Sequence, residues 1–335
     1  MTSLAIITGA TGQDGSYLIE LLLKKDYNVY CLVRRSTYNI RNSNISLTSL
    51  SNDKLKIFDA DLTDQSSINK VFQAAKIFDY IEVYNLAAQS DVGISFECPN
   101  LTVDINFIGT LNMLESIKQS GLISKVKFYQ ASTSEMFGKV QQVPQTEKTA
   151  FYPRSPYGIS KLAAHWMVIN YREAYGLFAC CGILFNHESP RRGSNFVTQK
   201  IVKTLKSKKV LEIGNLEARR DWGHAKDYVD GMWLMLQQEK PDDYVVSSGE
   251  QHSVRDFINK VAVLCDSQIT WKGSGLDEIG IDKHGNTIIK VSEKFYRPCE
   301  VDTLLGDCSK IKSIGWKQMY SFDELVQDMF KDIII

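Results

Sequence analysis

LAIITGATGQDGSYLIELLLKK, residues 4–25, joins a short apolar segment to a longer apolar-periodic one through three glycines. The first part reads as a strand, and SYLIELLLKK has the apolar spacing of a helix. Gly9, Gly12 and Gly15 form a GxxGxxG pattern between them. Glycines here allow a tight turn, close approach of the backbone to a pyrophosphate, and close packing of helix on strand. The pattern favours binding of a dinucleotide.

The same alternation continues through the first half of the chain. Strand-like segments are expected at Leu4–Thr8, Asn28–Val33, Leu55–Phe58, Tyr80–Leu86, Val126–Ala131 and Phe178–Phe185. Helices are expected at Tyr17–Lys25, Ser66–Lys76, Thr102–Gln119 and Tyr157–Tyr175. Alternating strands and helices predict an α/β fold, a Rossmann-like doubly wound parallel sheet covered by helices on both faces.

Two stretches depart from this alternation. After about residue 186 it loosens, so we expect a cofactor domain at 1–185 and a smaller, interleaved C-terminal substrate-binding lobe at 186–335. The segment Ser36–Asn52 is rich in Ser, Asn and Thr. It reads either as an exposed loop or as a loop that orders against a ligand or a neighbouring subunit.

The composition describes a folded chain with no net charge. Of 335 residues, 39 are Lys or Arg and 39 are Asp or Glu. Nucleic-acid binders and membrane-surface helices normally carry a basic excess, so neither class is favoured. Hydrophobic residues make up 44% of the chain, which excludes a disordered protein. No run of about 18 apolar residues is present, so we expect no membrane-spanning helix.

Seven cysteines, at positions 31, 98, 180, 181, 265, 299 and 308, form no CxxC pair and no zinc-like pattern with His. We therefore expect reduced, mostly buried thiols and no metal site. The first residues lack the basic and long apolar regions of a signal peptide. Together these features predict a cytoplasmic protein.

The end of the second expected strand indicates which cofactor would fit. An NAD site normally has an acid about 20 residues after the glycines, to bind the ribose 2′-hydroxyl. Arg34 and Arg35 stand there instead. Two guanidinium groups suit a 2′-phosphate, so NADP is favoured over NAD. The other interpretation is a solvated pair at a strand end.

A YxxxK pattern at Tyr157 and Lys161 places both side chains on one helical face. The lysine charge is expected to lower the tyrosine pKa from its usual value of about 10 toward the working range. Just upstream, the strand Val126–Ala131 ends in the sequence STSE, residues 132–135. Hydroxyls and a carboxylate there would face the ligand side of the sheet, although STSE also reads as a helix-capping box.

Six segments in order resemble the extended short-chain dehydrogenase/reductases: GATGQDG, LAAQSDV, ASTSE, YPRSPYGISKLAA, LFNHESPRRG and RDWGHAKDYV. Within that group the chain is most similar to the GDP-mannose 4,6-dehydratases, from about residue 4 to about residue 330. The resemblance implies a hydro-lyase that converts GDP-D-mannose to GDP-4-dehydro-6-deoxy-D-mannose, on the way to GDP-fucose or GDP-rhamnose. The implied cofactor is NADP, tightly bound and recycled within each turnover.

By the same resemblance, four residues carry the chemistry. Tyr157 deprotonates the 4-hydroxyl, Thr133 steadies the 4-oxygen, Glu135 removes the C5 proton and assists loss of water, and Lys161 tunes Tyr157 and binds the ribose. Reasoning from the residues supports this division, because oxidation needs one base and elimination needs a second acid–base group.

The resemblance also implies the binding residues. The cofactor set is Gly9, Thr11, Gly12, Gln13, Asp14, Gly15, Arg34, Arg35, Ser36, Thr37, Asp61, Leu62, Leu86, Ala87, Ala88, Gln89, Ser90, Lys161, His187 and Arg192. The family's aromatic position is Leu101 here, so no contact is carried to it. His187 also reads as a structural histidine. The implied substrate residues are Asn186, Lys200, Arg220, Arg297 and Glu300.

The 11 arginines include three doublets, at 34–35, 191–192 and 219–220, which suit two phosphate-binding sites. The resemblance implies a homo-oligomer, a tetramer or a dimer, in which the Ser36–Asn52 loop reaches a neighbour's cofactor. The alternatives are a dehydratase or epimerase for dTDP- or UDP-hexoses, and a non-catalytic NADP-sensing protein. A secondary reduction of the 4-keto product is a further expectation left open.

Overall fold

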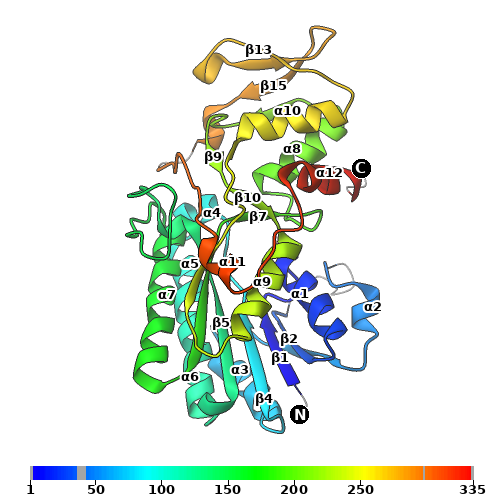
Figure 1. Cartoon of the computed structure of the whole chain (residues 1–335). Helices are drawn as coiled ribbons and strands as arrows, with labels where there is room; N and C mark the ends of the chain where they lie inside the picture. The colour runs from blue at the N-terminus through cyan, green and yellow to red at the C-terminus, as the bar shows by residue number, and fades with distance from the viewer. Residues whose placement is uncertain (1–2, 36–42, 297–298, 333–335) are drawn as a thin grey trace.

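A computed structural model describes residues 3–35, 43–296 and 299–332 (Figure 1). Its centre is a seven-stranded sheet in the order β11-β6-β5-β4-β1-β2-β3, in which every neighbouring pair is parallel. This confirms the predicted doubly wound sheet. The strands are β1 (Ser3–Thr8), β2 (Asn28–Val33), β3 (Leu55–Asp59), β4 (Tyr80–Asn85), β5 (Val126–Thr133), β6 (Phe178–Leu184) and β11 (Asp243–Val246).

Side chains alternate along these strands between two apolar cores. On β1, Ala5 and Ile7 pack on one face of the sheet, whereas Leu4 and Ile6 pack on the other, and all four are fully buried. Helices α1 (Gln13–Lys24) and α9 (Ala225–Leu236) cover the first face. Helices α3 (Gln65–Ala75), α6 (Gly109–Gln119) and α7 (Pro156–Tyr175) cover the second. Because both faces of the central strands are buried, these strands are rich in apolar residues, whereas the edge strand β3 is partly exposed.

A smaller lobe lies above the large sheet in Figure 1, beyond the carboxyl ends of its strands. Its core contains Ile201, Phe257 and Ile289. Its helices are α8 (Val197–Lys206), α10 (Val254–Leu264) and α12 (Phe322–Asp332). Its strands are β7 (Asn186–Glu188) with β10 (Trp222–His224), β9 (Arg219–Arg220) with β12 (His252–Ser253), and β13 (Thr270–Lys272), β14 (Ile279–Ile281), β15 (Thr287–Val291) and β8 (Leu211–Ile213).

The chain returns to the large sheet after entering the small lobe. Helix α9 packs on α1, and β11 adds a strand beside β6. The remaining helical segments are α2 (Leu47–Leu50), α4 (Val92–Glu97), α5 (Pro99–Val103), η2 (Asp104–Ile108), η3 (Ile123–Lys125), η4 (Ser134–Met136), η5 (Gly275–Asp277), η6 (Glu293–Phe295) and α11 (Ser309–Ser313). Within the described ranges, we find no helix that is both long and apolar enough to cross a membrane.

Several element ends differ from the sequence-based expectation. Helix α1 begins at Gln13 rather than Tyr17, because Gly12 at its N-cap leads directly into the first turn. Strand β5 runs on to Thr133. The expected helix at 102–119 is instead α5, a π-helical turn η2, and α6. Of the Ser36–Asn52 segment, residues 36–42 lie outside the described residues, and the rest contains α2.

Candidate active site

A cleft of about 890 Å³ opens at the carboxyl ends of the central strands, beneath the small lobe. It is lined by residues from the glycine turn, from the ends of β4, β5 and β6, and from the small lobe. Of the sequence-predicted residues, the structure brings into this one cleft Gly9, Thr11, Gly12, Gln13, Asp14, Gly15, Arg34, Asp61, Leu62, Leu86, Ala87, Ala88, Gln89, Ser90, Thr133, Glu135, Tyr157, Lys161, Asn186, His187, Arg192, Lys200, Arg220 and Glu300.

Three predicted residues could not be placed, and one lies apart. Ser36, Thr37 and Arg297 are outside the described residues. Arg35 is exposed but is not among the residues that line the cleft, whereas its neighbour Arg34 is. The lining therefore holds one arginine of this doublet.

The glycine turn leaves no room for side chains. Gly9 has a φ of +68°, and a Cβ atom there would lie 2.8 Å from the backbone nitrogen of Ala87. A Cβ at Gly15 would lie 2.7 Å from the Cα of Ala10. Helix α1 starts immediately afterwards, and no side chain caps its N-terminus at Gly12. Its first N–H groups and the positive end of its dipole therefore face the cleft, an arrangement that suits a pyrophosphate.

The segment after β6 is bonded to the first turn of α1. Nε2 of His187 lies 2.8 Å from the Asp14 carboxylate, and its Nδ1 lies 2.7 Å from the carbonyl oxygen of Phe185. Burial lowers the pKa of His187, but the negative charge of Asp14 outweighs it and the pKa is raised overall. An acceptor faces each ring nitrogen, an arrangement that favours the protonated form of the ring. The Ser189 hydroxyl donates to Gln13 Oε1 at 2.8 Å and adds a second link.

The other two arginine doublets each divide between the cleft and the scaffold. Arg191 donates to Glu20 on α1 at 2.7 Å and lies over the Tyr17 ring, so it anchors the segment. Arg192 lines the cleft, with its Nε 3.1 Å from Glu188. Likewise, Arg219 bonds Gln251 at 3.2 Å, and Arg220 faces the cleft. Arg219 and Arg220 are neighbours on the extended strand β9, so their side chains point to opposite sides. Arg191 and Arg192 instead lie in a turn, in which the N–H of Arg192 donates to the Ser189 carbonyl at 3.0 Å.

The four predicted catalytic residues come from β5 and α7. Thr133 ends β5, and its hydroxyl accepts the N–H of Glu135 at 3.2 Å, capping the short helix η4. A short helix does begin here, but the predicted capping box is not formed, because Thr133 rather than Ser132 is the N-cap and the Ser132 hydroxyl lies 3.0 Å from His165 Nδ1. Residues 132–135 all line the cleft. Ser155 caps α7 and Pro156 occupies its first turn, so the helix begins just before Tyr157. Tyr157 and Lys161 are both buried.

The acid–base balance of this group differs from the expectation. Burial raises the pKa of Tyr157 to about 12, although a hydrogen bond with Thr133 and the charge of Arg192 lower it. Burial lowers the pKa of Lys161 to about 8. The prediction that Lys161 lowers the tyrosine pKa is therefore wrong for these side chains, because burial of the phenol outweighs the neighbouring charges.

Asn106 is a site-supporting residue that the sequence analysis missed. It lies in the π turn η2, where its Oδ1 accepts the N–H of Gln89 at 2.9 Å. Its Nδ2 donates to Ser160 Oγ at 3.0 Å, between Tyr157 and Lys161 on α7. Asn106 thus ties the cofactor loop after β4 to the catalytic helix. The available signal was a polar residue on the buried side of an apolar helix, and π turns often mark functional sites.

The small-lobe end of the cleft carries charged side chains. Nζ of Lys200 lies 3.3 Å from the centre of the Phe295 ring, and burial lowers the lysine pKa. Arg220 Nη2 lies 3.3 Å from Glu300 Oε1. Phe295 was not predicted, although an aromatic ring in a charged stretch of sequence is a useful signal. An arginine, a lysine and an exposed ring together suit a nucleotide diphosphate and its base.

Comparison with known proteins places the whole chain in one family. A family model described as GDP-mannose 4,6 dehydratase matches residues 6–329. The chain is 50% identical to GDP-mannose 4,6 dehydratase of Homo sapiens, over 98% of this chain and 90% of that protein. It is 47% identical to GDP-mannose 4,6-dehydratase of Vibrio cholerae, over 98% and 93%.

Solved structures match the fold. UDP-glucose 4-epimerase of Thermus thermophilus, in complex with NAD, has a TM-score of 0.81 at 23% identity over 98% of both chains. dTDP-glucose 4,6-dehydratase of Bacillus anthracis, also with NAD, has a TM-score of 0.81 at 19% identity over 99% and 96%.

Proposed function

This chain belongs to the GDP-mannose 4,6-dehydratase family, and we propose that it converts GDP-D-mannose into GDP-4-dehydro-6-deoxy-D-mannose and water. The observation that carries this function is the meeting of Thr133, Glu135, Tyr157 and Lys161 in one cleft. They lie between a glycine turn suited to a dinucleotide and a cationic end suited to a nucleotide sugar.

The proposed cofactor is a nicotinamide dinucleotide, and NADP in particular. The glycine turn fits it, because Gly9 and Gly15 let the turn pack against the backbone of Ala87 and Ala10, which brings the N-terminus of α1 to the cleft. Arg34 lines the cleft at the end of β2, where an NAD site has an acid. Arg192 adds a guanidinium group, which is paired with Glu188. When bound, the nicotinamide supplies a hydride acceptor and returns the hydride to the same sugar.

Two acid–base groups divide the remaining work. Tyr157 exchanges a proton with the 4-hydroxyl of mannose, and Thr133 donates a hydrogen bond to that oxygen. A ketone at C4 makes the C5 proton acidic, and Glu135 takes it. The same carboxyl then gives a proton to the 6-hydroxyl, which leaves as water while the C5–C6 double bond forms. Lys161 lies on the same face of α7 as Tyr157 and is assigned to bind the ribose of the cofactor.

We assign the two ends of the cleft to different parts of the chain. Residues 1–185 hold the cofactor and the catalytic groups. Residues 186–335 hold the nucleotide sugar, through Asn186, Lys200, Arg220 and Glu300, with Arg297 as an additional contact from the sequence resemblance. Guanidinium and ammonium groups there neutralise the substrate diphosphate.

A homo-oligomer in the cytoplasm is the proposed working form. Leu101, Ile108, Ile159 and Trp166 are exposed on the neighbouring helices α5, η2 and α7, and Trp166 is 56% exposed. Large apolar side chains grouped on a surface mark association sites. A tetramer or dimer is expected by light scattering, and a monomer that retains its cofactor would contradict this.

Free cysteines in the described chain agree with a reducing compartment.

Incubation of the enzyme with GDP-mannose tests the function. The expected product is a 4-keto-6-deoxy sugar nucleotide that has lost one water, identified by mass spectrometry and by reduction with borohydride. UDP-glucose and dTDP-glucose serve as competing substrates in parallel reactions. Faster turnover of either one would contradict the assignment, and so would cofactor binding without any turnover.

A further inference from the structure

Asp221 is a buried carboxylate that the proposed reaction does not use. It lies between strands β9 and β10, and its neighbours Arg220 and Trp222 both line the cleft. Asp221 itself is 0% exposed and is not among the lining residues. A fully buried charge needs hydrogen bonds or opposite charges to compensate for lost water. Its partners therefore show what it holds in place.

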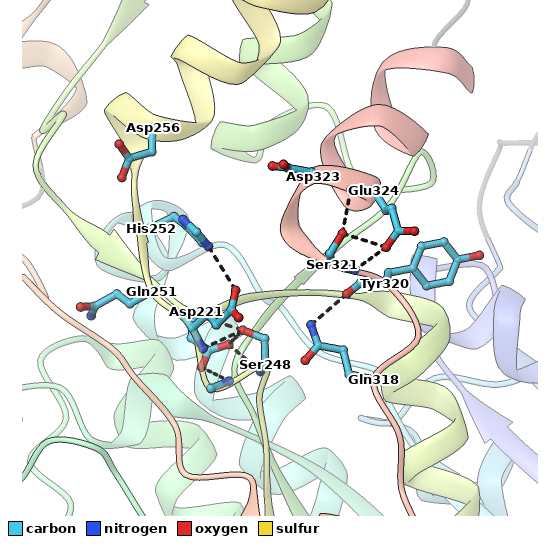
Figure 2. Close-up of polar contacts among 12 residues, drawn as sticks. Asp221, Ser248, Gln251, His252, Asp256, Gln318, Tyr320, Ser321, Asp323 and Glu324 are labelled. Carbon is cyan, nitrogen blue, oxygen red and sulfur yellow. Dashed lines mark hydrogen bonds and ion pairs between the residues drawn. The ribbon is translucent and has the colours of Figure 1, made fainter.

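Four donors from two distant segments converge on this carboxylate. Oδ1 accepts the backbone N–H of Ser248 at 2.7 Å and its hydroxyl at 2.6 Å (Figure 2). Oδ2 accepts the N–H groups of Gly249 at 3.0 Å and Gly306 at 3.3 Å. Burial raises the pKa of Asp221 to about 6, and these hydrogen bonds limit the rise. Asp221 thus joins the loop after β11 to the stretch that follows Glu300.

The same stretch also pairs with the backbone of Arg219, immediately before Arg220. The N–H of Arg219 donates to the Asp302 carbonyl at 2.9 Å, and the N–H of Leu304 donates to the Arg219 carbonyl at 3.2 Å. On its other edge, β9 pairs with β12, where Arg220 is opposite His252. The backbone before Arg220 is fixed by the sheet, and the backbone after it is fixed by Asp221.

We propose that Asp221 is a positioning residue that holds the Arg220–Glu300 pair against the cleft for the diphosphate end of the substrate. This deepens the proposed function and rests on it for the class of substrate. The direction in which a side chain leaves an extended chain is set by the backbone on both sides of it. Loss of the Asp221 anchor would turn the Arg220 guanidinium, and phosphate recognition by arginine depends on that direction.

Asp227 provides a matched control for a purely structural effect. It is also buried, and burial likewise raises its pKa to about 6. Its carboxylate accepts the N–H of Tyr320 at 3.1 Å, which fastens the approach to α12. Asp227 does not line the cleft and has no neighbour in the chain that does.

The test compares Asp221→Asn with Asp227→Asn in the full chain. An amide in place of Asp221 keeps one acceptor oxygen but turns an NH2 group toward two of the four donors, so half of the anchor is lost with little change in volume. The dissociation constant of GDP by calorimetry, and KM for GDP-mannose, should rise by about tenfold or more in Asp221→Asn. Cofactor affinity and kcat should stay unchanged. Asp227→Asn should lower Tm with GDP affinity unchanged.

Equal losses of Tm with unchanged GDP affinity in both variants would overturn the proposal. Ser248→Ala removes one donor without disturbing the carboxylate, so a smaller rise in the GDP dissociation constant is expected, and no rise would also overturn it. In an Arg220→Ala background, Asp221→Asn should add nothing further, whereas additive losses would show an independent role. Wild-type turnover of GDP-mannose is the separate test of the function, so the two failures are distinguishable.

Discussion

The two ends of the cleft recognise their ligands by different means. In the proposed function, recognition at the cofactor end depends on the backbone: Gly9 and Gly15 allow the turn to pack closely against neighbouring backbone, and the N-terminus of α1 supplies N–H groups. At the substrate end, it depends on the side chains of Lys200, Arg220 and Glu300. Those side chains come from segments up to 100 residues apart in the sequence. Backbone recognition leaves a compact local motif, whereas side-chain recognition is assembled by the tertiary fold.

The largest effect is expected at Glu135, which lies between the two ends of the cleft. A variant there should lose the reaction but keep binding at both ends. Glu135→Gln removes the acid–base group for elimination, so dehydration should fall by about 100-fold to 10,000-fold. Calorimetry should give wild-type affinities for NADP and GDP, because neither end contains Glu135. Dehydration at the wild-type rate would contradict the assigned mechanism, and a loss of either affinity would show that the ends are not independent.

A substitution in the glycine turn should abolish cofactor binding and leave the substrate end unchanged. Gly9→Ala places a Cβ 2.8 Å from the Ala87 nitrogen, and overpacking costs about 1–3 kcal/mol beyond the left-handed strain of about 1–2 kcal/mol. Cofactor should be lost on gel filtration. Gly176→Ala is the control, because Gly176 has the same φ of +68° and nothing within 4 Å. It should show the strain alone in denaturant unfolding, with cofactor retained. If Gly9→Ala and Gly176→Ala retained cofactor equally well, the close contact with Ala87 would not explain the need for glycine at position 9.

Removal of the Arg34 side chain should weaken the preference for NADP over NAD without abolishing cofactor binding. Arg34→Ala should weaken NADP binding by about tenfold, the value of one charge-assisted hydrogen bond of about 1.5 kcal/mol. NAD binding should be unaffected. Arg35→Ala should have the smaller effect, because only Arg34 of the described pair lines the cleft. Fluorescence titration measures both, and equal weakening of NAD and NADP would contradict the assignment.

The smallest effect is expected from pH. The pKa of His187 is raised above its usual value of 6.5 by Asp14. A raised pKa stabilises the folded state fully below the unfolded value, and the contribution is lost as pH rises through the folded value. The Tm difference between wild type and His187→Gln should therefore be largest below the usual value of 6.5 and shrink as the pH rises through the raised pKa of His187. A difference that stays constant would indicate packing against Tyr228 instead.

The local parts of this molecule could be predicted from the sequence, and the long-range parts could not. The glycine turn and the Tyr157–Lys161 spacing follow from periodicity and position. Which arginine of a doublet enters the cleft depends on strand direction, and a π turn at Asn106 leaves no pattern in hydrophobic periodicity. The prediction of a lowered pKa for Tyr157 was wrong, because the sequence shows which residues are neighbours but not how deeply a side chain is buried. The substrate residues came only from the resemblance.

The return of the chain to the large sheet limits how this enzyme can be divided or recombined. A fragment ending after β6 would lack α9, which covers α1, and β11, which pairs with β6. It would expose an apolar face and an unpaired strand edge, both of which favour aggregation. A chimaera that exchanges only the small lobe must therefore keep residues 225–246 with the large sheet. We therefore expect the large sheet and the small lobe to fold as one unit.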